Sequence, residues 1–257
     1  MRNKRIGAAA AIVNDEGGVL RPLTGAFGSY HEDSRLMTEW ECDALLFDLD
    51  GVLVNSAACV ERHWRRWAVE HQLDGDEIMR CAHGRPTVET IRLVAPHLSV
   101  EAEAAQLDAG EAGDTDGVMI VQGAAQLVSS LPLDAWAIAT SGTRDTALAR
   151  LKHTGVPIPS VLVTAGDVER GKPNPDSYLL AAARLGVGAE RCVVIEDAPT
   201  GIMAAHAAGM RVVALATTHR KEDLAEADAR AARLIDVQIS PRDVGFGRRL
   251  TVRVTGV

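Results

Sequence analysis

ALLFDLDG, residues 44–51, is the stretch that decides how this chain of 257 residues folds. Its four apolar residues predict a buried strand, and Asp48 and Asp50 follow that strand directly. Unpaired carboxylates are costly to bury, so both acids are expected to emerge at the strand's tip. Open α/β sheets place their chemistry at that end, and Gly51 lets the backbone turn closely past a ligand. The stretch therefore predicts an acidic nucleophile, a second carboxylate for acid–base work and a cation.

Further apolar runs along the chain predict a parallel sheet. Near-continuous apolar runs are typical of parallel strands covered on both faces, and the expected strands are 43–48, 135–140, 161–164, 192–196 and 211–215. The helices expected between them are one capped by Thr143 and running to Thr154, one from Pro175 to Leu185 with Asn174 as N-cap and Gly186 as the stop, and one from Pro199 to near Gly209. This alternation predicts an α/β fold, a doubly wound parallel sheet with a Rossmann-like core.

One long interval breaks the alternation. Residues 56–122 show only helical patterns, over 57–71 and in stretches that begin at Pro86 and Ser99. This interval is too long for an ordinary connection between a strand and a helix, so it predicts an inserted helical cap domain over the tip of the first strand. The expected division is a poorly ordered extension over 1–36, an α/β core over 37–55 and 123–257, and the cap over 56–122. The tail after Ser240 is left open, with 250–254 as a candidate strand.

Composition bounds the class of protein. A formal charge of −8 argues against general nucleic-acid binding, which usually needs a basic face. No apolar run approaches the roughly 20 residues of a membrane-spanning helix, so no membrane partner is expected. The four cysteines form no CxxC pair, and we interpret them as reduced thiols in a cytoplasmic protein. We expect the chain to act as a monomer.

Polar segments follow the expected strands or the loops after them. They are Asp48 with Asp50, Thr140-Ser141-Gly142, Lys172 in its loop, and Glu196 with Asp197. Because the carboxyl ends of parallel strands point the same way, these groups are expected to meet in one crevice. An aspartate can attack phosphorus, carboxylates suit Mg²⁺, and a lysine and a hydroxyl can hold phosphate oxygens. The set indicates phosphoryl transfer with Mg²⁺ as cofactor.

Four motifs in this order resemble the haloacid dehalogenase superfamily of hydrolases, in the subgroup with a helical cap after the first strand. They are FDLDG at 47–51, ATSG at 139–142, GKPNPD at 171–176 and IEDAPTG at 195–201, and the resemblance covers about residues 42–220. It implies that Asp48 is the nucleophile. It also implies that Asp50 protonates the leaving alcohol, then activates water, and binds Mg²⁺ through its backbone carbonyl.

The resemblance also implies roles for the two middle motifs. Thr140 would bind the transferring phosphoryl group, and Ser141 and Gly142 beside it are candidate substrate-binding residues. Lys172 would neutralise that group while it orients Asp48. These residues would therefore hold the phosphate while the cap supplies specificity.

The last motif would complete the metal site. Asp197, with Glu196, would bind Mg²⁺ together with Asp48 and Asp50. Dehalogenases that resemble this fold lack the second aspartate, and phosphonate-cleaving relatives carry a small residue in its place and use a cap lysine. Asp50 is present, and no lysine lies between residues 56 and 122. Both observations favour hydrolysis of a phosphate monoester.

Residues around the cap indicate the substrate class. The segments that hold Asn55, His83 and Arg85 look like those of sugar- and polyol-phosphate phosphatases, so these three are candidate substrate-binding residues. The alternative is that His83 and Arg85 are ordinary surface residues of the cap. Trp64 and Trp67 share one helix face, and we expect them in the cap core, although interleaved aromatic and basic residues can also stack nucleotides.

The expected function is that of a Mg²⁺-dependent phosphatase that hydrolyses a small sugar or polyol phosphate through an aspartyl-phosphate intermediate. Its expected partner is a small phosphorylated metabolite. The alternatives are a sugar-phosphate mutase of the β-phosphoglucomutase type, a phosphoglycolate phosphatase, and a non-catalytic sugar-phosphate-binding regulator. A mutase keeps the same aspartate pair, so the pair does not separate it from a phosphatase. A binding module has no need of a nucleophile, so the intact acidic set argues against the regulator.

Overall fold

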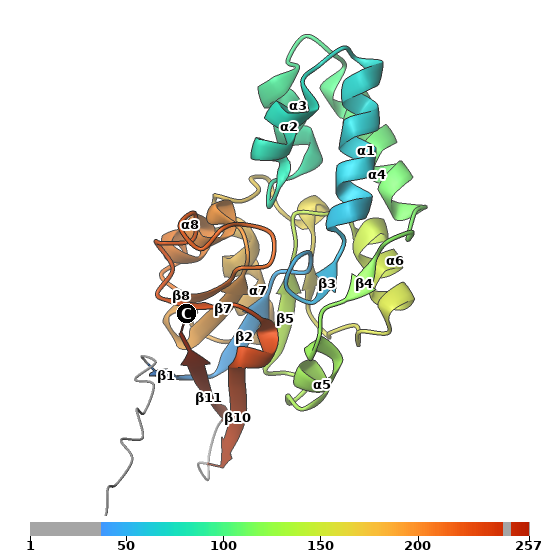
Figure 1. Ribbon diagram of the computed structural model, residues 1–257. Coiled ribbons are helices and arrows are strands. Elements are labelled where there is room, and N and C mark those ends of the chain that lie inside the picture. The colour runs from blue at the N-terminus through green and yellow to red at the C-terminus, as the bar shows by residue number, and fades with distance from the viewer. Residues whose placement is uncertain (1–36, 244–247, 257) are drawn as a thin grey trace, which may run out of the picture. The chain divides into compact units, whose positions relative to one another are not determined.

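A six-stranded parallel sheet, in the order β6-β5-β2-β7-β8-β9, forms the centre of the fold (Figure 1). The computed structural model describes residues 37–243 and 248–256, and the extension expected over 1–36 lies outside the described residues. The strands are β2 (Ala44–Phe47), β5 (Trp136–Ala139), β6 (Leu162–Val163), β7 (Cys192–Glu196), β8 (Arg211–Leu215) and β9 (Ala229–Ala231). All five expected strands are confirmed, each end within one residue. The short strand β9 was not expected, because Ala-Arg-Ala has no apolar run.

Helices cover both faces of this sheet, as a doubly wound fold requires. They are α5 (Ala124–Ser129), α6 (Arg144–Thr154), α7 (Asp176–Leu185) and α8 (Pro199–Ala207). Leu45 and Phe47 of β2 pack in one buried cluster with α5 and α6, whereas Ala44 and Leu46 pack in another with α7 and α8. Successive residues of a strand point to opposite faces, so one short apolar run supplies both cores.

The ends of these helices follow local rules. Thr143 caps α6 by accepting a hydrogen bond from the Thr146 amide, as expected. Gly186 ends α7 in the left-handed conformation, where a side chain would add strain. The expected N-cap of α7 is wrong by one residue: Pro175 takes that position. Asn174 instead donates from its side chain to the carbonyl of Gly171, 3.0 Å away, and so holds the preceding turn.

Four helices occupy the long interval between β2 and residue 122. They are α1 (Ala57–Glu70), α2 (Gly75–Ala82), α3 (Thr87–Val94) and α4 (Val100–Ala112), and Figure 1 shows them gathered beyond the short antiparallel pair β3 (Val54–Asn55) and β4 (Met119–Ile120). Trp64 and Trp67 are buried in the apolar cluster of these helices, with ring centroids 5.6 Å apart in an edge-to-face arrangement. Their expected burial in the apolar core of these helices is confirmed. The helix α2 and the pair β3–β4 were not expected.

A second sheet, antiparallel and three-stranded, joins both ends of the described chain. Its order is β1-β11-β10, with β1 (Met37–Cys42), β10 (Val237–Asp243) and β11 (Arg248–Thr255). The candidate strand over 250–254 is therefore confirmed within β11. On its outer face Arg253 pairs with Glu39 at 2.6 Å. Three turns of 3-10 helix complete the elements: η1 (Ala165–Asp167), η2 (Ala189–Arg191) and η3 (Leu234–Asp236).

Among residues 37–243 and 248–256, no helix has both the length and the apolar character that a membrane crossing needs.

Candidate active site

The carboxyl ends of β2, β5 and β7 open into a cavity that the helical cap also borders. Its lining includes eight of the residues that the sequence predicts for the site: Asp48, Asp50, His83, Arg85, Thr140, Ser141, Gly142 and Asp197. The strand β2 lies between β5 and β7, so its own end is at the middle of this edge. The parallel register thus brings together segments that are up to 150 residues apart in the sequence.

Lys172 and Asp48 form the buried centre of the site. Lys172 Nζ lies 2.5 Å from Asp48 Oδ1 and 2.7 Å from Glu196 Oε1, and the lysine side chain is only 1% exposed. Burial alone would lower the pKa of Lys172, but the two carboxylates raise it well above its usual value, so the ammonium stays charged. The Tyr178 ring adds a cation–π contact, with its centroid 4.7 Å from Nζ. This cation orients one oxygen of Asp48 and leaves the other free.

Glu196 lies behind the cavity and not in its lining. Oε1 accepts hydrogen bonds from Lys172 and, at 3.1 Å, from the Tyr178 hydroxyl. Oε2 accepts from the backbone amides of Asp197 and Ala198 at 2.6 and 2.8 Å. Burial raises the pKa of Glu196, but Lys172 and these amides outweigh that effect and lower it. The expected role of Glu196 as a direct metal ligand is therefore corrected: its oxygens are committed to holding Lys172 and the start of α8.

Asp48 and Asp197 supply carboxylates to the cavity itself. Burial raises the pKa of Asp48 to about 7, with Lys172 opposing that rise and Glu196 and Asp50 adding to it. Burial, together with Glu196 and Asp48, also raises the pKa of Asp197. Several carboxylates held together in one buried place favour a bound cation, because a cation offsets their repulsion.

The turn at Gly51 leaves room for the Asp197 carboxylate. A Cβ at Gly51 would lie 1.9 Å from Asp197 Oδ2, and its φ of +82° is one that other residues adopt only with strain. Thr218 donates to the same carboxylate and so orients it. Carboxylates are the hard oxygen ligands that Mg²⁺ prefers, so the Asp48 and Asp197 carboxylates in the cavity lining fit the expected cofactor.

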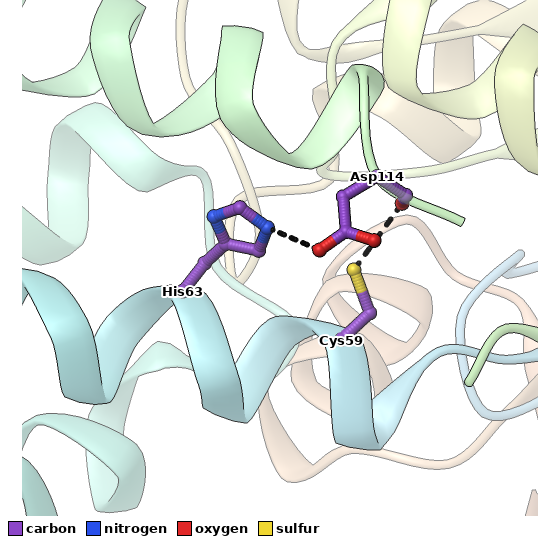
Figure 2. A group of neighbouring side chains, drawn as sticks. All are labelled: Cys59, His63 and Asp114. Carbon is purple, nitrogen blue, oxygen red and sulfur yellow. Dashed lines mark hydrogen bonds and ion pairs between the residues drawn. The ribbon is translucent and has the colours of Figure 1, made fainter. Parts of the chain in front are cut away.

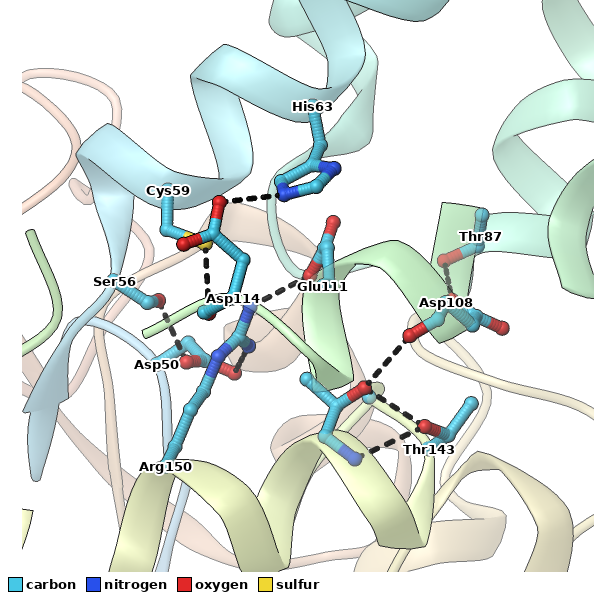
Figure 3. A network of polar contacts seen from close by, with 12 residues as sticks. Asp50, Ser56, Cys59, His63, Thr87, Asp108, Glu111, Asp114, Thr143 and Arg150 are labelled. Atoms are coloured by element: carbon cyan, nitrogen blue, oxygen red, sulfur yellow. Dashed lines mark hydrogen bonds and ion pairs between the residues drawn. The ribbon is translucent and has the colours of Figure 1, made fainter. Parts of the chain in front are cut away.

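Asp50 is held from two sides. Ser56 donates to its Oδ1 at 2.6 Å, and Arg150 Nη1 lies 2.8 Å from its Oδ2 (Figure 3). Arg150 also contacts Glu111 of the cap, with Nη2 and Oε2 2.6 Å apart. Arg150 was not among the site residues that the motifs predict. A signal existed: Arg150 shares the buried face of α6 with Thr146, and a charged residue on such a face usually has a specific partner.

The loop after β5 lines the cavity and also contacts the cap. Thr140 is buried, and its Oγ1 accepts a hydrogen bond from the Gly142 amide at 3.1 Å. Ser141 donates from its hydroxyl to the carbonyl of Gly84 at 2.9 Å, and so joins the core to the cap. The phosphate-binding roles of these residues stay predictions.

The three candidate substrate-binding residues do not lie together. His83 and Arg85 line the cavity, and each is tied to the backbone of α2 at 3.1 Å, to Met79 and Cys81 respectively. Asn55 instead lines a separate hollow, and its side chain accepts from the Ala57 amide at 3.3 Å. The expected place of Asn55 in this site is corrected, because Asn55 is not in the lining of the cavity; the two hollows share Gly51 and Thr218.

A second cluster, Cys59, His63 and Asp114, joins the first helix of the cap to the residues after α4 (Figure 2). Asp114 Oδ2 lies 2.9 Å from His63 Nε2 and 2.7 Å from Arg62 Nη2, and the Cys59 thiol donates to the Asp114 carbonyl at 3.4 Å. The hydrogen bond from Arg62 is the largest cause of a lowered pKa at Asp114. Such ligand types can hold a metal, but here the guanidinium already neutralises the carboxylate. We interpret the cluster as a structural contact that holds α1 against the residues after α4.

Comparison with known proteins agrees with the motifs and the fold. The family model for haloacid dehalogenase-like hydrolases matches residues 42–209. Hexitol phosphatase A of Escherichia coli (strain K12) is 44% identical over 179 residues, which cover 68% of this chain and 83% of that protein. Glycerol-1-phosphate phosphohydrolase 2 of Saccharomyces cerevisiae is 34% identical over 198 residues, which cover 72% of this chain and 78% of that protein. This chain belongs to the family of haloacid dehalogenase-like hydrolases.

A solved structure has the same architecture. The β-phosphoglucomutase from Clostridium difficile matches with a TM-score of 0.67 and 22% identity, over 75% of this chain and 92% of that chain. At that identity the likeness concerns the fold alone. The predicted fold class, a parallel α/β core, is confirmed.

Proposed function

We propose that this protein is a Mg²⁺-dependent phosphatase that hydrolyses the phosphate monoester of a small sugar or polyol through an aspartyl-phosphate intermediate. The observation that carries the proposal is the Asp48 carboxylate, which lies 2.5 Å from the buried Lys172 ammonium and shares one cavity with Asp50 and Asp197. The hexitol and glycerol phosphatases among the relatives support the same reaction class.

In the first half of the proposed reaction, Asp48 attacks phosphorus through the oxygen that Lys172 leaves free. A bond forms between that oxygen and phosphorus, and the bond from phosphorus to the ester oxygen breaks. Asp50 donates its proton to the leaving oxygen, so an alcohol departs and an aspartyl phosphate remains. Lys172 and the backbone amides near Thr140 offset negative charge on the phosphoryl oxygens.

In the second half, water replaces the alcohol. Asp50, now a carboxylate, takes a proton from water, and the oxygen of that water attacks phosphorus. The bond from phosphorus to Asp48 breaks, which releases inorganic phosphate and restores both side chains. A Mg²⁺ ion held by Asp48, the Asp50 carbonyl and Asp197 would supply further charge neutralisation at the phosphoryl group.

The charges around the cavity favour a neutral leaving group. The cap contributes Asp108 and Glu111 to the lining, and Asp108 Oδ1 accepts from Thr87 at 2.6 Å. Carboxylates accept hydrogen bonds from hydroxyl groups but repel a second anion. Arg85 is the one cap cation that borders the cavity. A polyol or sugar therefore suits this surface better than a leaving group with its own carboxylate, which the alternative phosphoglycolate reaction requires.

We also propose the domain organisation expected from the sequence. Residues 37–55 and 123–257 would be the catalytic core, and residues 56–122 the cap that selects the substrate. The protein would act as a monomer. The four cysteines are free thiols, which suits the reducing cytoplasm.

A phosphate-release screen tests the proposal. Purified protein with Mg²⁺ is assayed on sorbitol 6-phosphate, glycerol 1-phosphate, glucose 1-phosphate, phosphoglycolate and AMP. We expect release of inorganic phosphate from the polyol and sugar esters and little from phosphoglycolate. Stoichiometric phosphate release from glucose 1-phosphate counts against a mutase. Binding without turnover across the panel contradicts the proposal and favours the regulator.

A further inference from the structure

Arg150 connects the cap to the proposed acid–base residue. It lies on α6 of the core, is 3% exposed, and contacts Asp50 at 2.8 Å and Glu111 at 2.6 Å. Glu111 is in the last turn of α4 in the cap, whereas Asp50 follows β2. Figure 3 shows the guanidinium between the two carboxylates, with α4 on one side and α6 on the other.

We propose that Arg150 is a positioning residue that holds the Asp50 carboxylate in place for proton transfer when Glu111 of the cap is seated against it. This inference rests on the proposed phosphatase function. It goes beyond that function because it assigns a residue outside the four motifs and makes the arrangement of the acid–base group depend on the cap.

The contacts restrict the orientation of Asp50. Arg150 holds Oδ2, while the Ser56 hydroxyl, at the start of the cap, holds Oδ1 at 2.6 Å. A carboxylate offers about four lone-pair positions, so each oxygen still has one left, which can carry the proton for the leaving group or accept a hydrogen bond from water. Proton transfer needs hydrogen-bond geometry between the donor and the reacting oxygen, and a carboxylate fixed at both oxygens meets that need without reorganising.

The shape of a guanidinium is required for this bridge. Two different nitrogens of Arg150 contact two carboxylates from separate elements, which a planar fork allows and a lysine ammonium does not reproduce. The buried Nε of Arg150 has no hydrogen-bond partner among the described residues. The contacts to Asp50 and Glu111 therefore determine how the group is oriented, even though one donor stays unsatisfied.

The bridge lies where the cap meets the core. Thr146, one turn before Arg150 on α6, donates to the Asp108 carbonyl of α4 at 3.4 Å. If α4 moved away, Arg150 would lose its ion pair with Glu111. The guanidinium beside Asp50 would then no longer be held in place by a second carboxylate. The complete arrangement therefore exists only with the cap against α6, so the cap would govern when Asp50 is in place.

The test compares two phosphate esters that differ in their need for a general acid. An alkyl ester such as glycerol 1-phosphate has a leaving group that must be protonated, whereas the p-nitrophenolate of p-nitrophenyl phosphate leaves without a proton. We measure kcat and KM on both esters for wild type, Arg150→Met, Arg150→Lys, Glu111→Gln and Asp50→Asn. Lys152→Met, a charge removal on the exposed side of the same helix, is the control, and circular dichroism checks folding.

We expect Arg150→Met to lower kcat on glycerol 1-phosphate about 100-fold, the lower end of what general acid catalysis contributes, and kcat on p-nitrophenyl phosphate by less than about 10-fold. Asp50→Asn should show the same contrast, and Arg150→Lys should recover little. Glu111→Gln should show a smaller contrast in kcat between the two esters. The double variant that combines Glu111→Gln with Arg150→Met should match Arg150→Met alone, because both residues act through Asp50. Lys152→Met should match wild type.

If Arg150→Met loses kcat equally on the two esters, or keeps the wild-type kcat on both, the inference is overturned while the phosphatase function stands. If Arg150→Met does not fold, Glu111→Gln decides: the same contrast between esters supports the inference, and its absence overturns it. A wild-type protein that hydrolyses neither ester nor any ester of the panel above refutes the proposed function itself, so the two failures are distinguishable.

Discussion

Replacing Lys172 with methionine removes the central cation of the site. Methionine keeps most of the apolar stem but leaves Asp48 and Glu196 without the ammonium that lies 2.5 and 2.7 Å from them. Removing one partner of a buried ion pair costs about 3–5 kcal/mol. For a domain of 150–250 residues, each kcal/mol lowers Tm by about 2–4 °C, so we expect a fall of roughly 6–20 °C.

The assay is thermal unfolding by calorimetry, with Lys152→Met as the matched control because Lys152 is exposed in the last turn of α6. We also expect kcat for phosphate release to fall about 100- to 1000-fold, as when one preorganised donor is lost. Adding Glu196→Gln to Lys172→Met should restore part of the stability, since one unpaired carboxylate is then removed. A Tm for Lys172→Met equal to that of the control would refute the reasoning.

Three further outcomes follow from the site. Gly51→Ala should raise the Mg²⁺ concentration needed for half-maximal activity about 10-fold or more, because the added Cβ would lie 1.9 Å from Asp197 Oδ2. Gly155→Ala is the control for backbone strain, because Gly155 has a similar φ of +72° and nothing lies within 4 Å of its added Cβ. Equal metal dependence of the two variants would contradict the clash. Asp48→Asn should abolish turnover in the phosphate-release assay while circular dichroism shows an intact fold, and near-wild-type activity would mean that another group attacks phosphorus. The raised pKa of Asp48, about 7 against an ordinary 3.8, means that the folded state keeps a proton that the unfolded state loses, so metal-free protein should lose stability as pH rises from about 4 to 7. Added Mg²⁺ should then raise Tm more at pH 8 than at pH 5, and an equal rise at both would refute this account.

Local patterns were sufficient for the sheet and for the segments that meet at its edge. A parallel strand covered on both faces needs a continuous apolar run, which is why β7 and β8 were predicted at their observed bounds. The same reasoning failed at β9 and β1, where the pattern is short or alternates with exposed glutamates. Pairing with a distant strand decides such segments, and a local pattern does not contain it.

The division between sequence and structure is clearest at Glu196 and Asp197. Their motif predicted an acidic pair, but neighbouring residues at the end of a strand point to opposite sides. Asp197 thus enters the cavity, and Glu196 turns behind it to Lys172 and Tyr178. The sequence by itself determined the class of fold, the family and the acids, lysine and hydroxyl of the site, because these depend on local apolar runs and short motifs.

Only the tertiary structure decided that Arg150 bridges Asp50 and Glu111, and that Asn55 stays outside the cavity. These facts depend on how α6 of the core packs against α4 of the cap, and on the pairing of β3 with β4 outside the six-stranded sheet. Such contacts join residues about 40 to 100 positions apart, and their energies arise from burial and charge in the folded state. No local stretch of the chain carries that information, because the partners become neighbours only on folding.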